Sequence, residues 1–168
     1  GTGLVWYGGV IGGTIAVIAV ALWRKLPIGI VANVVGPCLA LGYAIGRIGC
    51  QLSGDGDYGR ATSLPWGMSY PDGEVPTTEI VHPTPIYETT AMLLVFFVLW
   101  RLRDRFNRPW QLFGLWAILA GAERFLVEFV RRNEDVAIGL TTAQLVSVGF
   151  MLAGAALMAT ARRWRPPS

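Results

Sequence analysis

The sequence predicts an all-α protein: a polytopic transmembrane helix bundle with a polar extracytoplasmic arm. Of its 168 residues, 53% are hydrophobic and only 15% are charged. The charges are gathered into short clusters between long apolar stretches, whereas a soluble domain interrupts such stretches every turn or two. A membrane-crossing helix needs about 20 mostly apolar residues. We therefore treat the chain as a single membrane domain.

Five stretches meet this requirement. Residues 4–23 and 26–46 contain no charged residue. Three later stretches can also span if their few ionic residues face the protein interior. We expect transmembrane helices near 4–23, 27–47, 85–101, 110–130 and 138–161, with the polar arm at about 49–84. Because the first residue is Gly1 and not Met, we read the chain as a fragment that lacks upstream helices.

The basic residues orient these helices. If each helix reverses the direction of the one before, nine of the fourteen basic residues fall on one side, which marks the cytoplasm. These nine are Arg24, Lys25, Arg101, Arg103, Arg105, Arg108, Arg162, Arg163 and Arg165. The arm then lies outside and has too few apolar residues for its own core. We expect it to lie on the bundle, with Trp66, Tyr58 and Tyr70 available as anchors among lipid headgroups.

Two other classes are not favoured. The net charge of +3 does not indicate nucleic-acid binding, because most basic residues sit at helix ends as topological signals. Cys38 and Cys50 lack the spacing of a metal-ligand pair, and neither a disulfide nor a zinc site is expected. We expect no metal and no cofactor.

The stretch from Gly46 to Gly59 is the most informative. An apolar helix runs into Arg47, and a glycine-dense polar turn follows. Glycines let the backbone approach a ligand, and a guanidinium offers a planar fork of donors to a phosphate. This combination predicts an anionic lipid headgroup site. The alternative is that Arg47 reaches toward the interface and the glycines only form a turn.

A second pattern places Arg124 and Glu128 four residues apart, on one face of an apolar helix. Ionisable groups inside a spanning helix are costly and are seldom retained without pairing or function. If the pair faces the bundle interior, Glu128 holds the Arg124 fork while Arg124 binds a substrate phosphate. A purely structural ion pair is the alternative.

The third pattern runs from His82 to Glu88. Thr84 is a plausible N-cap with Pro85 at the first helical position, and Glu88 suits the positive end of the helix dipole. His82 is the single histidine. A histidine at a loop end is more often a hydrogen-bonding partner than a catalyst, although His82 remains a catalytic candidate.

The fourth pattern opens the first apolar stretch with Tyr7, Gly8 and Gly9, followed by Gly12 and Gly13. Closely spaced glycines in a membrane helix usually permit tight helix packing. On the same face, Tyr7 could reach a bound headgroup.

Taken in order, these motifs resemble the prolipoprotein diacylglyceryl transferase family. The resemblance rests on Tyr-Gly-Gly, then Gly-Arg-x-Gly with a following Gly-Asp and aromatic-Gly, then His-Pro-Thr-Pro-x-Tyr-Glu, then Arg-x-x-x-Glu-Phe, and it runs from Gly3 to about Arg163. It implies a multi-pass protein of the bacterial cytoplasmic (inner) membrane with about seven spans. The implied reaction transfers the diacylglyceryl group of phosphatidylglycerol to the lipobox cysteine of a preprolipoprotein and releases glycerol phosphate. Its partners would be phosphatidylglycerol, preprolipoprotein signal peptides and membrane lipid.

The resemblance also implies site residues. The family's functional positions match Arg47, Asp55, Gly59, Arg124 and Glu128. Cys50 stands where the family usually has asparagine, and Tyr7 where it has histidine. The glycine-rich turn is one residue longer, so Asp57 is an alternative to Asp55. The catalytic candidates are Arg47, Arg124, Glu128, Tyr7 and His82, and the last three are candidate proton acceptors. The substrate-binding candidates are Arg47, Cys50, Asp55, Gly59, Tyr87, Glu88 and Arg124.

Two other functions remain open. A non-catalytic protein of this fold could bind anionic lipid without transferring it, and it would keep Arg47 and Arg124 while tolerating the changes at Cys50 and Tyr7. A small-solute transporter is disfavoured by the absence of inverted repeats in the sequence.

Overall fold

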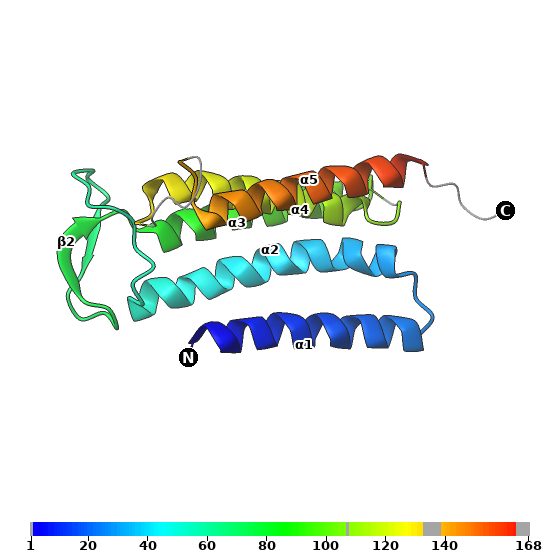
Figure 1. Ribbon diagram of the computed structural model, residues 1–168, viewed down its shortest axis with the longest axis horizontal. Coiled ribbons are helices and arrows are strands. Elements are labelled where there is room, and N and C mark those ends of the chain that lie inside the picture. The colour runs from blue at the N-terminus through cyan, green and yellow to red at the C-terminus, as the bar shows by residue number, and fades with distance from the viewer. Residues whose placement is uncertain (1, 107, 133–138, 164–168) are drawn as a thin grey trace.

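The chain folds into the expected all-α membrane bundle. A computed structural model describes residues 2–106, 108–132 and 139–163, with the side chains of residues 2–7, 162 and 163 outside the description. The long helices lie side by side, each antiparallel to the one before (Figure 1). They are α1 (Thr2–Trp23), α2 (Ile28–Ser53), α3 (Thr84–Leu102), α4 (Gln111–Val127) and α5 (Thr142–Arg163). Within the described part, Ile28–Ser53, Thr84–Leu102 and Thr142–Ala161 are long and apolar enough to cross a membrane.

The two ends of the bundle differ. At one, the arm end, α2 and α3 are joined by residues 54–83, which include strands β1 (Met68–Tyr70) and β2 (Thr77–Val81). At the other, the loop end, lie the short connections from α1 to α2 and from α3 to α4, described over residues 24–27, 103–106 and 108–110 (Figure 1). α4 ends at the arm end, where a 3-10 turn, η1 (Glu128–Val130), follows it.

The core lies between α2, α3 and α4. Its buried members are Ala40, Ala44, Met92, Leu99 and Leu112. The alanines of α2 leave room for the larger side chains of α3 and α4, so these helices approach closely and bury apolar surface.

On its other side, α4 packs against α5 through glycines. A Cβ atom added at Gly154 would lie 2.5 Å from the carbonyl oxygen of Gly114, and one added at Gly121 would lie 2.8 Å from that of Ser147. These distances leave no room for a side chain. Small residues of this kind are how membrane helices gain close packing.

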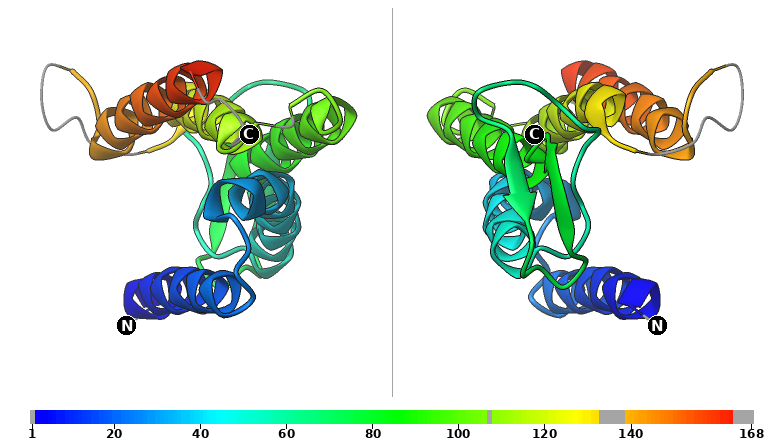
Figure 2. Two further views of the ribbon diagram at one scale, coloured as in Figure 1. Left: turned by 90° about the vertical axis from the view of Figure 1, so that its right-hand side faces the viewer. Right: turned by 90° about the vertical axis from the view of Figure 1, so that its left-hand side faces the viewer.

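α1 behaves differently. It lies at the edge of the molecule, away from α3, α4 and α5 (Figure 2). A Cβ atom added at Gly8, Gly9, Gly12 or Gly13 would have no atom within 4 Å in the described structure. The close packing that these glycines predict is therefore not made with any described segment.

α2 extends further than expected. It continues to Ser53 and stops at Gly54, which has φ +62° and donates its N–H to the carbonyl of Cys50. A left-handed glycine is a common helix terminator. Cys50 therefore lies on the last turn of α2 and not in the glycine-rich turn, while Arg47 lies on α2 as expected. Gly54 is also crossed closely by Gly73, whose Cα would lie 2.7 Å from an added Cβ.

The arm has a small core of its own, contrary to expectation. Tyr58, Tyr70 and Val81 are buried together, and the two tyrosine rings stack with centroids 4.1 Å apart. The Tyr58 hydroxyl hydrogen-bonds the carbonyl of Val75 at 2.8 Å. The proposal that Tyr58 and Tyr70 are headgroup anchors is therefore wrong, because stacking buries them. Trp66, 56% exposed, remains available for that role.

At the loop end, Asn33 caps α4 from α2. Its amide nitrogen donates to the carbonyl of Arg108 at 2.7 Å, and its oxygen accepts from the backbone N–H groups of Leu112 and Phe113 at 2.9 and 3.2 Å. The first N–H groups of a helix have no partner within it, so this side chain satisfies two of them. Asn33 thereby joins α2 to α4 with neutral hydrogen bonds alone.

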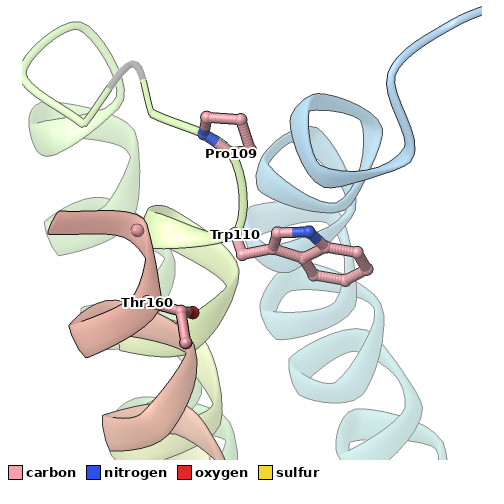
Figure 3. Close-up of a pocket in the computed structure, with 4 residues that line it drawn as sticks. Pro109, Trp110 and Thr160 are labelled. Atoms are coloured by element: carbon pink, nitrogen blue, oxygen red, sulfur yellow. The ribbon is translucent and has the colours of Figure 1, made fainter. Parts of the chain in front are cut away.

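Trp110 reinforces this junction. Its backbone is left-handed (φ +65°), and its N–H donates to the carbonyl of Gly29 at 2.9 Å. The indole points toward α2 (Figure 3), where a Cβ atom added at Gly29 would lie 2.6 Å from the indole nitrogen. A hollow beside it is lined by Pro109, Trp110, Thr160 and Ala161.

Candidate functional site

Charged side chains from α2, α3, the arm and the end of α4 meet at the arm end of the bundle. We call this group the arginine cluster. Its members are Arg47, Asp57, Glu88, Arg124, Glu128 and Arg131. Because ionisable groups are costly at membrane depth, such a gathering marks a site that the fold has been built to hold.

Glu88 is the centre of the cluster. Its side chain is fully buried. One carboxylate oxygen pairs with Arg47 Nε and accepts a hydrogen bond from the Tyr43 hydroxyl at 3.1 Å, and the other pairs with Arg131 Nη1 at 3.1 Å. Glu88 therefore does more than interact favourably with the helix dipole, because it also binds two arginines and a tyrosine.

Asp57 closes the ring. Its two carboxylate oxygens pair with Arg47 Nη1 and Arg131 Nη2. Two guanidinium groups and two carboxylates therefore neutralise each other in a closed arrangement, which we call the clamp (Arg47, Asp57, Glu88 and Arg131). Burial raises the pKa of Asp57, but the attraction of Arg131 and Arg47 outweighs it and holds that pKa below its ordinary value.

Local geometry positions the clamp. Tyr43 and Arg47 are four residues apart on α2, and Arg47 Nη2 donates to the Tyr43 hydroxyl at 3.1 Å. The Asp57 N–H donates to Asp55 Oδ1 at 3.2 Å, and the Thr84 hydroxyl donates to the Asp57 carbonyl. The expectation that Thr84 caps its helix is therefore wrong, because its hydroxyl is taken by the arm. Asp57 is the arm carboxylate that meets the arginines.

Gly59 lies where the arm crosses the segment after η1. A Cβ atom there would lie 2.5 Å from the carbonyl oxygen of Val130, so no larger residue fits. Its N–H donates to the carbonyl of His82, and its carbonyl accepts from Arg132 Nε at 3.0 Å. Gly59 is buried with its backbone groups bonded, and its contacts fix the segment that carries Arg131.

Arg124 stands at the open edge of the cluster. Its Nη1 lies 2.6 Å from Glu128 Oε2, and Glu128 also accepts a hydrogen bond from the Thr141 hydroxyl at 2.7 Å. Glu128 is the one ion-pair partner of Arg124 among the described residues. The Arg124 side chain is 26% exposed, against 16% for Arg47 and 12% for Arg131. Arg124 therefore keeps guanidinium donors for a ligand.

Arg47 and Arg124, far apart in sequence, are brought into one connected cluster. The connection runs through Arg131, whose Nε lies 4.0 Å from Glu128 Oε2 and which shares both clamp carboxylates with Arg47. The two arginines are thus linked by intervening ion pairs.

Other candidates lie outside these ion pairs. His82 Nδ1 is 3.2 Å from the Tyr87 hydroxyl, which accepts from Trp66 Nε1 at 2.9 Å. This chain of contacts anchors the arm to α3, and no described contact joins His82 or Tyr87 to the arginine cluster. The side chain of Tyr7 lies outside the described residues.

Cys50 sits beside the clamp, with its Sγ 3.8 Å from Arg47 Nη1. The polar neighbours of Cys50 are bonded within the arm end: Gln51 accepts from the Tyr70 hydroxyl, and the Ser53 hydroxyl donates to the carbonyl of Cys50. The ligand atoms of Cys50, Asp55 and Asp57 lie within 4.8 Å of one another. Since two arginines already neutralise Asp57, this trio is poorly suited to a cation.

Sequence reasoning missed three members of this region. Arg131 is not among the predicted site residues, although it lies three residues after Glu128 and seven after Arg124, a spacing that shares their helical face. Tyr43 carries the same kind of signal, four residues before Arg47. Glu123 is 8% exposed, and nothing in the sequence separates it from an acid facing water.

Comparisons with known proteins agree with the resemblance. The family model described as prolipoprotein diacylglyceryl transferase matches residues 1–160. Three similar proteins are each named phosphatidylglycerol–prolipoprotein diacylglyceryl transferase. The chain is 34% identical to that of Clostridium tetani, 38% to that of Chromohalobacter salexigens and 32% to that of Rhodospirillum rubrum, over 92%, 96% and 98% of its own length. It covers 62%, 61% and 62% of these relatives, or about three fifths of their length.

Proposed function

The chain belongs to the prolipoprotein diacylglyceryl transferase family, and from this premise we propose that it carries the reaction centre of diacylglyceryl transfer. The donor is phosphatidylglycerol, the acceptor is the lipobox cysteine thiol of a preprolipoprotein, and glycerol phosphate leaves. The observation that carries the proposal is the arginine cluster. It gathers three arginines at one end of a membrane bundle and leaves the donors of Arg124 available.

The chemistry needs guanidinium donors that a phosphate can reach. The acceptor thiolate attacks the glycerol carbon that bears the phosphate ester, and negative charge builds on the departing phosphate oxygen. A preorganised guanidinium stabilises that charge where water is excluded, and losing one such donor typically costs a factor of about 10²–10³ in rate. Arg124 is the residue to which we assign this contact. The other catalytic and substrate-binding candidates remain proposals.

The clamp supports Arg124 in this scheme. The guanidinium groups of Arg47 and Arg131 pair with the carboxylates of Asp57 and Glu88. Their first role is therefore to hold α2, α3, the arm and the end of α4 together. Arg131 in turn lies next to Glu128, which orients Arg124. The site is therefore positioned before substrate arrives, which is what a preorganised electrostatic site requires.

The two ends of the bundle support the proposed membrane location. Arg24 and Lys25 follow the end of α1, Arg101 lies in the last turn of α3, and Arg103 and Arg105 follow α3, so all five lie at the loop end. The positive-inside rule then puts the loop end in the cytoplasm and the arm end on the outer face of the bacterial cytoplasmic membrane. There the site meets phosphatidylglycerol and the signal peptides of preprolipoproteins.

A transfer assay tests the proposal. The whole protein is placed in vesicles of phosphatidylglycerol with a lipobox peptide, and mass spectrometry follows addition of the diacylglyceryl group to the cysteine. We expect modified peptide in these vesicles and none with phosphatidylethanolamine alone. Binding of phosphatidylglycerol without any modified peptide would replace the proposal by the non-catalytic lipid-binding alternative.

A further inference from the structure

One buried acid near the arginine cluster has no assigned role. Glu123 lies on α4 and is 8% exposed. Its Oε1 is fully buried and receives no hydrogen bond from any described residue. A buried carboxyl group without a partner is costly, so its presence calls for a reason.

The charges of the cluster leave Glu123 in surplus. The three guanidinium groups are matched by three carboxylates that pair with them. The pairs join Arg47 and Arg131 to Asp57 and Glu88, and Arg124 to Glu128. Glu123 makes no ion pair in the described structure, although it lies within range of electrostatic interaction with four of these groups. They are Glu88, Arg124, Arg47 and Arg131.

We propose that Glu123 accepts the proton of the acceptor cysteine thiol during diacylglyceryl transfer, an inference that rests on the proposed function. The Glu123 carboxyl group is buried on α4 within electrostatic range of Arg124, Arg47 and Arg131, so it lies on the side of α4 that faces the arginine cluster, near a phosphate held by Arg124. A carboxylate oxygen with no other donor is free to take that proton, directly or through one water.

The S–H bond breaks, its proton passes to a carboxylate oxygen of Glu123, and the sulfur electron pair forms the new bond to the glycerol carbon. The carbon–oxygen bond to phosphate breaks, and its electron pair leaves with glycerol phosphate. The proton then passes from Glu123 to the departing phosphate or to water, which restores the carboxylate.

The other acids are less suited. Glu88 and Asp57 each pair with two arginines, and Glu128 pairs with Arg124 and accepts from Thr141. Protonating any of them would break the ion pairs that position the site. His82 bonds Tyr87 in the arm. Glu123 can take a proton without disturbing these contacts.

Several titratable and charged groups on the neighbouring elements lie within electrostatic range of Glu123. They are Tyr43 and Arg47 of α2, Glu88 of α3, Arg131 after η1 and the neighbouring Arg124. Each of these five groups has a hydrogen-bonding or ion-pair partner in the described structure, whereas Glu123 has none. A change confined to Glu123 therefore removes the proposed acceptor and leaves the paired groups in place.

The test uses Glu123→Gln in the whole protein, in phosphatidylglycerol vesicles, with two lipobox peptides that carry cysteine or selenocysteine. With the cysteine peptide near neutral pH we expect a loss of about 10²–10⁴ in rate. The loss should shrink as pH approaches about 8.5, where the thiol ionises in solution. A selenol is ionised at neutral pH, so the variant should transfer to the selenocysteine peptide almost as fast as the parent protein. The KM for lipid should not change.

The controls separate this inference from the proposed function. Glu74→Gln removes an exposed arm carboxylate and should match the parent with both peptides. Selenocysteine transfer by the Glu123 variant also shows that it is folded. An equal loss with both peptides at every pH, or no loss at all, would overturn the role of Glu123. A parent protein without transfer activity would instead overturn the proposed function.

Discussion

The two ends of the bundle hold the same helices together by opposite means. At the loop end, Asn33 joins α2 to α4 with three neutral hydrogen bonds. At the arm end, partly buried arginines and carboxylates join α2 to α3, to the arm and to the segment that follows α4, with Glu123 left over. Neutral hydrogen bonds suffice to fix a helix junction. The costlier charged solution at the arm end therefore indicates a role beyond stability.

The largest expected effect on stability comes from Glu88→Gln. This change leaves Arg47 and Arg131 with one carboxylate between them in a buried site, and breaking a buried ion pair costs about 3–5 kcal/mol. Thermal unfolding in detergent should show a large drop in Tm.

Glu79→Gln is the matched control. It removes an exposed carboxylate of the arm that pairs with Arg132, and exposed ion pairs contribute about 0–1 kcal/mol to the free energy of unfolding. Similar Tm changes for Glu79→Gln and Glu88→Gln would mean that the clamp does not hold the arm end together.

Asn33→Ala should weaken the loop end by less. It leaves the N–H groups of Leu112 and Phe113 without their acceptor, which costs about 1–3 kcal/mol. The unfolding temperature should fall, while the transfer rate below that temperature should stay near that of the parent. Thr160→Ala removes an exposed hydrogen bond at the same end and should change neither. A slower transfer rate in Asn33→Ala, at temperatures where the variant is folded, would contradict the view that the loop end contributes to stability alone.

The smallest effect is the acid response of Asp57, which is partly exposed. Its pKa is lowered in the folded protein, so its contribution to stability is present above the ordinary value of about 3.9 and is lost as pH falls below it. Asp57→Asn should therefore lower Tm from pH 5 to 8, and the two Tm curves should converge in acid. Curves that stay parallel down to pH 3 would show that Asp57 does not bridge the arginines.

The sequence predicts the helices better than their ends. Long uncharged stretches indicate α1 and α2, because an apolar run of that length has few other folds. The sequence predicts that α2 ends near Arg47, because an arginine followed by glycines usually marks a helix end. In the structure the helix continues to Ser53 and stops at Gly54. The arm was also underestimated, because the stacking of Tyr58 on Tyr70 depends on a contact that spacing does not reveal.

The site divides in the same way. The local pair Arg124 and Glu128 follows from helical spacing. That Arg47 shares a region with Arg124 follows from the alternating helix directions, which place both residues near the same end of the bundle. The ion pairs by which Arg131 connects Arg47 to Arg124 could not be predicted from the sequence. They depend on the arm crossing a segment about 70 residues later in the chain. Burial of Glu123 likewise depends on tertiary packing.

The most direct test of the account compares Arg124→Gln with Asn33→Ala in the whole protein, with transfer rate and Tm measured on the same samples. The account predicts that Arg124→Gln loses a factor of about 10²–10³ in rate, as for one oxyanion-binding donor, with a smaller drop in Tm than Glu88→Gln. Asn33→Ala should lose Tm and keep its rate. Full transfer activity in folded Arg124→Gln would contradict the assignment of the arm end as the reaction centre.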